Sequence, residues 1–198
     1  MNLTDFDHYL IVDLESTCCD RNGANPNLIP RHEMEIIEIG AVLLDANSLR
    51  TLDEFNTFIH PVRHPKLTAF CTQLTTIQQS DVDTAPNFPE AIQAFQTWLA
   101  PYSRLLFCSW GDYDKTQLAQ DCAYHQLAFP LAAPHLNIKR QFTDSQNLPK
   151  RYGMDGALKM AGLELLGTHH RGIDDVRNMA QLMPYTLGRQ LLKTTKPA

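Results

Sequence analysis

The chain has 198 residues, 43% of them hydrophobic and 20% charged, which suits one globular domain with a sizeable core. Its formal net charge of −5 at pH 7 lacks the basic footprint of a protein that binds long nucleic acid tightly and non-specifically. The acidic balance still admits an enzyme that holds a few nucleotides through bound metal ions, because the ions supply positive charge themselves.

Three β-strands are predicted in the first third of the chain. Residues 8–14 form a short, continuously apolar run that is typical of a buried strand. Residues 35–45 form a second apolar run, and residues 50–60 form a third strand with spaced apolar side chains. The connection between the last two runs is rich in Asp, Asn and Ser, which favours a hairpin.

One more strand and several helices are predicted in the remainder. The strand lies at residues 105–110, and the helices lie at residues 65–79, 86–99, 112–127, 137–142, 153–163 and 174–187. Three strands followed by a strand among helices predict an α/β fold, with a mixed sheet flanked by helices. The sheet is expected to combine a three-strand meander with parallel strands.

The cysteines and the N-terminal residues indicate an intracellular protein. Five cysteines without a C-x-x-C pair predict neither a disulfide framework nor a zinc site, so we expect reduced thiols. The apolar run from Tyr9 to Val12 is too short for a signal peptide or a membrane span. A cytoplasmic location is therefore expected.

Asp13 and Glu15 are the first candidate functional residues. They lie two residues apart on a predicted strand, so both side chains point to the same face. Two crowded carboxylates repel each other, and a hard divalent cation is their natural partner. Taken alone, the pattern favours a strand end that simply reaches solvent.

A second acidic cluster occupies residues 109–114, where a predicted strand meets a predicted helix. Functional side chains often lie at such junctions in α/β sheets. Asp112 is interpreted as the N-cap residue, whose side chain accepts from free backbone N–H groups of the helix. Asp114 is then left to face the end of the sheet.

A third cluster occupies residues 169–175, just before the last predicted helix. His170 precedes Asp175 by five residues, and both can face one pocket if the loop turns at Gly172. The alternative is that the acids only favour the helix dipole and the histidines lie on the surface. Of the two histidines, His169 is expected to be such a surface residue.

The three clusters together predict a two-metal phosphodiesterase site. Two hard cations about 4 Å apart need this many oxygen ligands, and such pairs cleave phosphodiesters by activating water and stabilising the leaving oxygen. A histidine that is neutral near pH 7 can take the proton of the attacking water.

In this order the residues resemble the DEDDh superfamily of 3′→5′ exonucleases, and most of all the enhanced-RNAi-type exoribonucleases, which include the histone-mRNA 3′ exonuclease. The resemblance covers roughly residues 8–187, and the matching segments are residues 12–18, 35–42, 64–78, 109–114 and 170–178. It implies a ribonuclease-H-like fold with a fifth strand, which no segment of the sequence marks. It also implies a single exonuclease domain over residues 1–198, with residues 188–198 as a C-terminal tail.

The resemblance also implies roles for individual residues. Asp13, Glu15, Asp114 and Asp175 would bind two Mg²⁺ or Mn²⁺ ions, with Asp114 acting partly through water, and His170 would be the general base. The residues implied to bind the terminal nucleoside are Ser16, Thr17, Phe70, Leu74 and Tyr113.

For several of the residues that could contact the substrate, an alternative interpretation remains open. Phe70 and Leu74 lie at helical spacing and suit core packing equally well. Arg171 and Arg177 either steer phosphate or only solvate a surface. Thr76 stands where the family usually has glycine, so the loop near Leu74 is expected to differ.

The resemblance predicts cleavage from the 3′ end of single-stranded nucleic acid, with RNA favoured over DNA as the partner and nucleoside 5′-monophosphates as products. The alternatives are a DNA exonuclease, a regulatory binding module without turnover, and a phosphoesterase that acts on nucleotides, which suits the low pI. A homodimer is compatible with the family, although no apolar stripe marks an interface.

Overall fold

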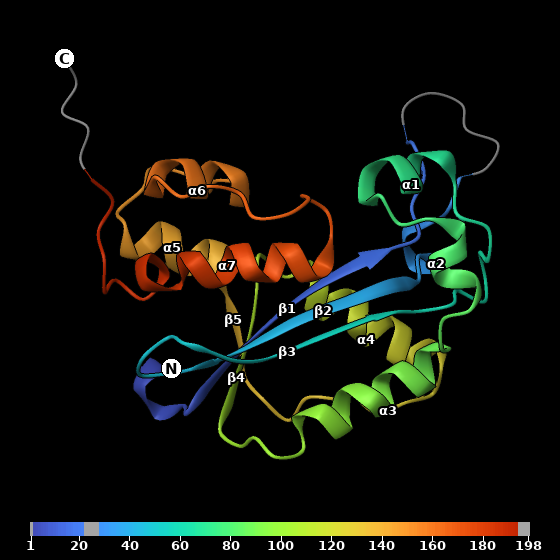
Figure 1. Cartoon of the computed structure of the whole chain (residues 1–198), viewed down its shortest axis with the longest axis horizontal. Helices are drawn as coiled ribbons and strands as arrows, with labels where there is room; N and C mark the ends of the chain where they lie inside the picture. The colour runs from blue at the N-terminus through green and yellow to red at the C-terminus, as the bar shows by residue number, and fades with distance from the viewer. Residues whose placement is uncertain (1, 22–27, 194–198) are drawn as a thin grey trace.

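A five-stranded mixed sheet is the centre of the computed structural model, which describes residues 2–21 and 28–193 (Figure 1). The strands are β1 (His8–Ser16), β2 (Ile36–Asp45), β3 (Thr51–Phe58), β4 (Leu105–Ser109) and β5 (His135–Asn137). Their order is β3-β2-β1-β4-β5. The first three form an antiparallel meander, β4 is parallel to β1, and β5 is parallel to β4, as predicted for this sheet.

Helices cover both faces of the sheet. They are α1 (Ala69–Thr75), α2 (Gln79–Asp83), α3 (Phe88–Leu99), α4 (Tyr113–Tyr124), α5 (Ile138–Ser145), α6 (Met154–Ala161) and α7 (Gly172–Thr186). In Figure 1, α5, α6 and α7 lie on one face, α3 and α4 lie on the other, and α1 and α2 lie near the C-terminal end of β1. Short 3₁₀ turns at Leu3–Asp5 and Arg31–Glu33 complete the described elements.

Alternate side chains of β1 enter the two halves of the core. Tyr9 and Ile11 pack with residues of α5, α6 and α7, whereas Leu10, Val12 and Leu14 pack with residues of α3 and α4. This alternation is the period of two that a strand imposes on its side chains. Within the described ranges, no helix has the length and apolar character needed to cross a bilayer. All five cysteines are free thiols.

Most predicted elements are present with ends shifted by a few residues, but the helix predicted at residues 65–79 is wrong as a single element. The chain forms two short helices there, α1 and α2. Thr68 begins α1, since its hydroxyl accepts from the Cys71 amide at 3.0 Å. Thr76 ends α1 with a φ of 63°, the left-handed conformation in which glycine is usual.

The fifth strand lies between two predicted helices, and its last residue, Asn137, was predicted as the first residue of the helix at residues 137–142. β5 has three residues and runs directly into α5, which Asn137 caps through its side chain. Its pairing is confined to three residues of β4. A strand this short at a sheet edge has too few residues to display a strand period.

A close approach between two glycines seats α7 on the sheet. Gly40 pairs with Asp13 in the β1–β2 register, and a Cβ atom at Gly40 would lie 2.1 Å from the backbone carbonyl carbon of Gly172. Real Cβ atoms do not come this close to backbone. The N-terminus of α7 can therefore rest directly over Asp13 only because residue 40 has no side chain.

Gly40→Ala is expected to lower the free energy of unfolding by about 1–3 kcal/mol or more, because the clash is with backbone that cannot rotate away. Gly156→Ala is the matched control, since Gly156 lies inside α6 and its added Cβ would make only ordinary contacts, the nearest at 3.7 Å. The control should be neutral or stabilising by about 0.5–1 kcal/mol. Urea unfolding of both variants measures the difference, and equal stabilities would show that α7 does not need the glycine.

Candidate active site

The C-terminal end of β1 supplies two carboxylates. Asp13 and Glu15 follow Tyr9 and Ile11 in the alternation of the strand, so they point to the face that α7 covers. A register shift after Glu15 ends regular pairing with β2 at Ser16. The two acids thus stand where the sheet opens, on one face, as the sequence predicted.

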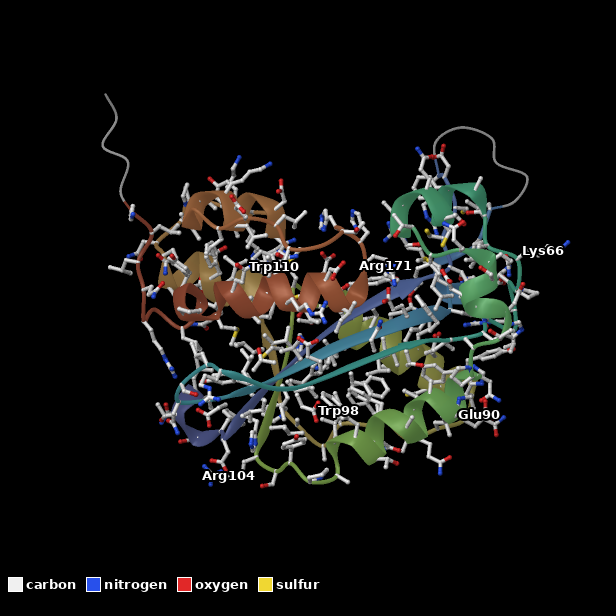
Figure 2. All side chains as sticks on the ribbon, viewed as in Figure 1. Lys66, Glu90, Trp98, Arg104, Trp110 and Arg171 are labelled. Carbon is white, nitrogen blue, oxygen red and sulfur yellow. The ribbon has the colours of Figure 1, made fainter. Side chains whose placement is uncertain are left out.

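The first turn of α7 supplies a third carboxylate, Asp175, which is 5% exposed. Glu38 of β2 anchors this turn, because its fully buried carboxylate accepts from the Gly172 amide at 3.1 Å and from Arg171 Nε at 3.2 Å. Figure 2 shows Arg171 at the end of α7 that meets the sheet. Arg171 is therefore engaged in a partly buried ion pair that holds the start of α7 against β2.

The second arginine considered for phosphate steering is also paired. Arg177 Nε lies 3.1 Å from Glu54 Oε1, and Arg177 Nη1 lies 3.4 Å from Asp174 Oδ1. These contacts join α7 to β3 at the surface. The guanidinium thus has two carboxylate partners within the protein.

The first turn of α4 supplies the fourth carboxylate, Asp114, which is buried. The Leu14 amide of β1 donates to Asp114 Oδ1 at 3.2 Å, and this bond ties the start of α4 to the C-terminal end of β1. Asp112 occupies the N-cap position, but its side chain makes no capping hydrogen bond, so that prediction is wrong. The Asp112 carboxylate is largely exposed and lies toward His135 and Arg140 instead.

Two adjacent histidines stand over Asp175. His170 has a φ of 65°, and its backbone N–H donates to Asp175 Oδ2 at 3.1 Å. His169 Nδ1 lies 3.1 Å from Asp175 Oδ1, and the two imidazole rings stack with centroids 4.0 Å apart. His169 is partly exposed, as expected of a surface residue, but its contact with Asp175 was not anticipated.

These groups line one cavity of about 330 Å³. It contains all five predicted catalytic residues, which are Asp13, Glu15, Asp114, His170 and Asp175. Six further lining residues were not predicted to belong to the site, namely Leu14, Trp110, Gly153, Met154, His169 and Met179. Trp110 belongs to the 109–114 segment and was within reach of prediction, whereas a glycine and two methionines carry no chemical signal.

The electrostatics of the cavity are dominated by crowded negative charge. Burial, followed by repulsion from Asp114 and Glu15, raises the pKa of Asp13 well above its ordinary value. Burial and the nearby Asp175 raise the pKa of Glu15 to about 9. Burial also raises the pKa of Asp114 to about 6, although hydrogen bonds to its carboxylate oppose the shift.

The donor set fits hard divalent cations. Carboxylate oxygens of Asp13, Glu15 and Asp175 all lie within 4.8 Å of one another. Mg²⁺ and Mn²⁺ prefer such oxygen ligands, and a cation relieves the repulsion that raises the carboxylate pKa values. Asp114 stands outside this group of three and contributes to the same cavity from α4.

The predicted substrate-binding residues divide into buried and exposed sets. Thr17 is buried, and its amide and hydroxyl are both bonded to the backbone of Glu35. The buried Ser16 hydroxyl makes no hydrogen bond of ordinary geometry among the described residues and lies beside Tyr113. Phe70 and Leu74 of α1 are more than a third exposed, so core packing does not account for them. Of these five, Tyr113 alone lines the cavity described above.

Comparison with known proteins places the chain among exonucleases. Residues 10–183 match the family described as Exonuclease, RNase_T. The chain is 30% identical to ERI1 exoribonuclease 3 of Mus musculus, over 97% of this chain and 58% of the relative. It is also 30% identical to the 3′-5′ exonuclease eri1 of Schizosaccharomyces pombe, over 92% of this chain and 68% of the relative. The chain therefore spans little more than half the length of the first of these relatives.

A solved structure shares the fold. The nuclease domain of 3′hExo, described as a DEDDh family member bound to rAMP, superimposes with a TM-score of 0.83 at 26% identity, over 98% of both chains. This likeness confirms the ribonuclease-H-like fold class that the sequence resemblance implied.

Asp13→Asn is expected to leave the stability of the metal-free protein unchanged or raised, unlike most substitutions. The pKa of Asp13 is raised in the folded state, so folding favours the protonated side chain. Its contribution to stability is complete below the ordinary pKa of an aspartate and is lost as the pH rises through the raised pKa. The advantage of asparagine should therefore be larger at pH 8 than at pH 5. Thermal unfolding without metal, at both pH values, measures it.

The second part of the Asp13→Asn test measures stability in the presence of Mn²⁺. At a hundredfold excess over Kd, a bound ion stabilises the wild-type fold by about 2.7 kcal/mol, and Asp13→Asn should lose most of that gain. A variant that melts far below wild type without metal would identify Asp13 as a structural residue. A variant that keeps the full metal-dependent gain would place the metal site elsewhere.

Proposed function

Since the chain belongs to the RNase_T exonuclease family, we propose that it is a metal-dependent 3′→5′ exonuclease that releases nucleoside 5′-monophosphates from single-stranded nucleic acid, with RNA as the favoured substrate. The observation that carries the proposal is the cluster of four carboxylates and two adjacent histidines in a single cavity. A binding module without turnover gains nothing from crowded acids that raise one another's pKa values.

Asp13, Glu15 and Asp175 are the residues that would hold the ions, with Asp114 completing the set from α4. Bound Mg²⁺ or Mn²⁺ would activate water and neutralise the charge that develops on the phosphate. The protein itself fixes the ligand positions. The Leu14 amide orients Asp114, and the His170 amide orients Asp175.

His170 is the proposed general base. Burial and the adjacent His169 lower its pKa, so the imidazole is neutral at pH 7 and can accept a proton. The left-handed backbone at His170 turns the loop so that the amide binds Asp175 while the ring faces the cavity. His169 contacts a proposed metal ligand and is a candidate for supporting that ligand.

The terminal nucleoside is proposed to bind beside the end of β1. Exposed Phe70, Leu74 and Tyr113 offer apolar surface for a base, and base–aromatic stacking contributes about 1–3 kcal/mol per base. The Ser16 hydroxyl, which makes no hydrogen bond of ordinary geometry among the described residues, is a candidate partner for the ribose. The Thr17 amide already donates to the Glu35 carbonyl and the Thr17 hydroxyl accepts from the Glu35 amide, so a contact from Thr17 must use its carbonyl oxygen or its hydroxyl proton.

RNA is favoured because relatives with similar sequences are named exoribonucleases and because a ribose 2′-OH offers a hydrogen-bond partner to the Ser16 hydroxyl. DNA cleavage by the same chemistry is the second candidate function. We further propose that residues 1–198 form one exonuclease domain in a cytoplasmic protein. A homodimer is compatible with this function and is tested by measuring the mass in solution.

Labelled RNA and DNA oligomers of one sequence test the activity directly. The RNA should shorten from its 3′ end and release 5′-monophosphates only with Mg²⁺ or Mn²⁺, because the carboxylates alone cannot activate water. A 3′-phosphate should protect the strand. Cleavage of a circular RNA at the linear rate would indicate an endonuclease, and undiminished cleavage in excess chelator would refute the metal site.

His170→Ala should lower kcat by about 10²–10⁴ while sparing Mn²⁺ binding, which is the loss expected of a general base. His169→Ala is the matched control, since it removes the adjacent imidazole. We expect it to change kcat little and to act, if at all, on metal affinity through Asp175. If the two effects are reversed, His169 is the base.

A further inference from the structure

One threonine hydroxyl joins α1 to the segment that follows β1. Thr68 Oγ1 accepts from the Cys71 amide at 3.0 Å, which caps the helix, and it donates to the Cys18 carbonyl oxygen at 2.6 Å. A hydroxyl has one proton to donate and lone pairs that accept, so both bonds form at once. The side chain that begins α1 is therefore also the side chain that docks the helix on the end of β1.

Other contacts of α1 are less directional. The fully buried Cys71 thiol lies 3.7 Å from the Ser16 carbonyl oxygen, and a thiol is only a weak donor. Cys71 also packs in a small apolar cluster with residues of β2 and α2, and apolar burial has no preferred direction. The short Thr68 bond is thus the contact best suited to fix where α1 lies relative to β1.

The place of α1 matters because its exposed face carries the two apolar side chains proposed to contact the terminal nucleoside. Phe70 and Leu74 are 38% and 36% exposed, whereas another face of the helix is buried. Asp13 and Glu15 lie on the strand whose continuation accepts the Thr68 bond, and Figure 1 shows α1 near the C-terminal end of that strand. The bond therefore ties the nucleoside surface to the strand that carries two proposed metal ligands.

We propose that Thr68 is a positioning residue for the terminal nucleoside. Its hydroxyl proton holds α1 at one place beside β1, so that Phe70 and Leu74 meet the base while the adjoining phosphate reaches the metal site. The inference rests on the proposed function in taking these two side chains as nucleoside contacts. Loss of the proton should leave α1 folded but less firmly placed, and nucleotide binding should weaken.

Substitutions of Thr68 can separate docking from capping. Thr68→Asp keeps a side-chain oxygen that caps α1, but an ionised carboxylate cannot donate to the Cys18 carbonyl. Thr68→Ser retains both bonds and should behave as wild type. Gln73→Glu is the charge control, since it adds the same negative charge to the exposed surface of α1, away from the docking bond.

The measurement is the affinity for adenosine 5′-monophosphate in the presence of Mn²⁺, beside the affinity for Mn²⁺ alone. Thr68→Asp should bind the nucleotide about 2- to 10-fold more weakly than Gln73→Glu does, which is the range that the net strength of one hydrogen bond supplies. Its KM for an RNA oligomer should rise by a similar factor. Its Mn²⁺ affinity should equal that of Gln73→Glu, because no proposed metal ligand is changed. A role confined to stability would lower Tm and leave the nucleotide affinities equal.

Equal nucleotide affinities of Thr68→Asp and Gln73→Glu would overturn the inference, and so would a loss in Thr68→Ser as large as that in Thr68→Asp. If Thr68→Asp does not fold, Thr68→Val replaces it, since it removes the hydroxyl at similar volume, and a wild-type nucleotide affinity in Thr68→Val would be equally decisive. These results overturn the inference alone when wild type binds the nucleotide and shortens RNA. A wild-type protein that does neither in the presence of Mn²⁺ would overturn the proposed function as well.

Discussion

The approach of α7 to the sheet at Gly40 is the constraint on which the site depends. Without a side chain at residue 40, the backbone of Gly172 can rest on β2, and Asp175 then reaches the acids of β1. Glu38 fixes the same contact by accepting from the Gly172 amide and from Arg171. One helix terminus is thus held at once by steric fit and by a partly buried ion pair, and the carboxylate it carries has little freedom to move.

The fold brings acids together against their mutual repulsion. In metal-free protein, burial and neighbouring charge raise the pKa values of Asp13, Glu15 and Asp114, which means that their ionised forms oppose folding. Backbone amides oppose the effect at Asp114 and Asp175, where N–H groups donate to the carboxylates. The remaining repulsion is what a bound cation relieves, so metal affinity and the stability of the fold are linked.

The placement of most of the acidic residues was predictable, because the sequence signals for it are local. Alternation along a strand places Asp13 and Glu15 on one face, and the junction of strand and helix places Asp114 beside them. The errors arise where the decisive partner is distant in sequence or the backbone is unusual. Asp112 does not cap α4 and instead lies toward residues of β5 and α5. The strand β5 is too short to show a period.

Backbone conformation accounts for two further differences between the predicted and the observed structure. The helix predicted through residue 79 ends at Thr76, because a threonine adopts the left-handed geometry that its side chain disfavours. His169 reaches Asp175 because the backbone at His170 is also left-handed. Neither conformation is a preference of the residue that adopts it, so local propensity does not reveal it. Tertiary contacts must hold both.

The seating of α7 also has a consequence for the order of folding. Asp13 and Asp175 lie near opposite ends of the chain, and contacts between such distant residues form late because the intervening loop must first be closed. A nascent chain that has emerged only through β5 contains the strand acids and Asp114 but lacks the helix that completes the site. The site is therefore complete only after α7 has docked on the sheet. Partly folded molecules in which α7 has not docked lack Asp175 at the site and should have no activity.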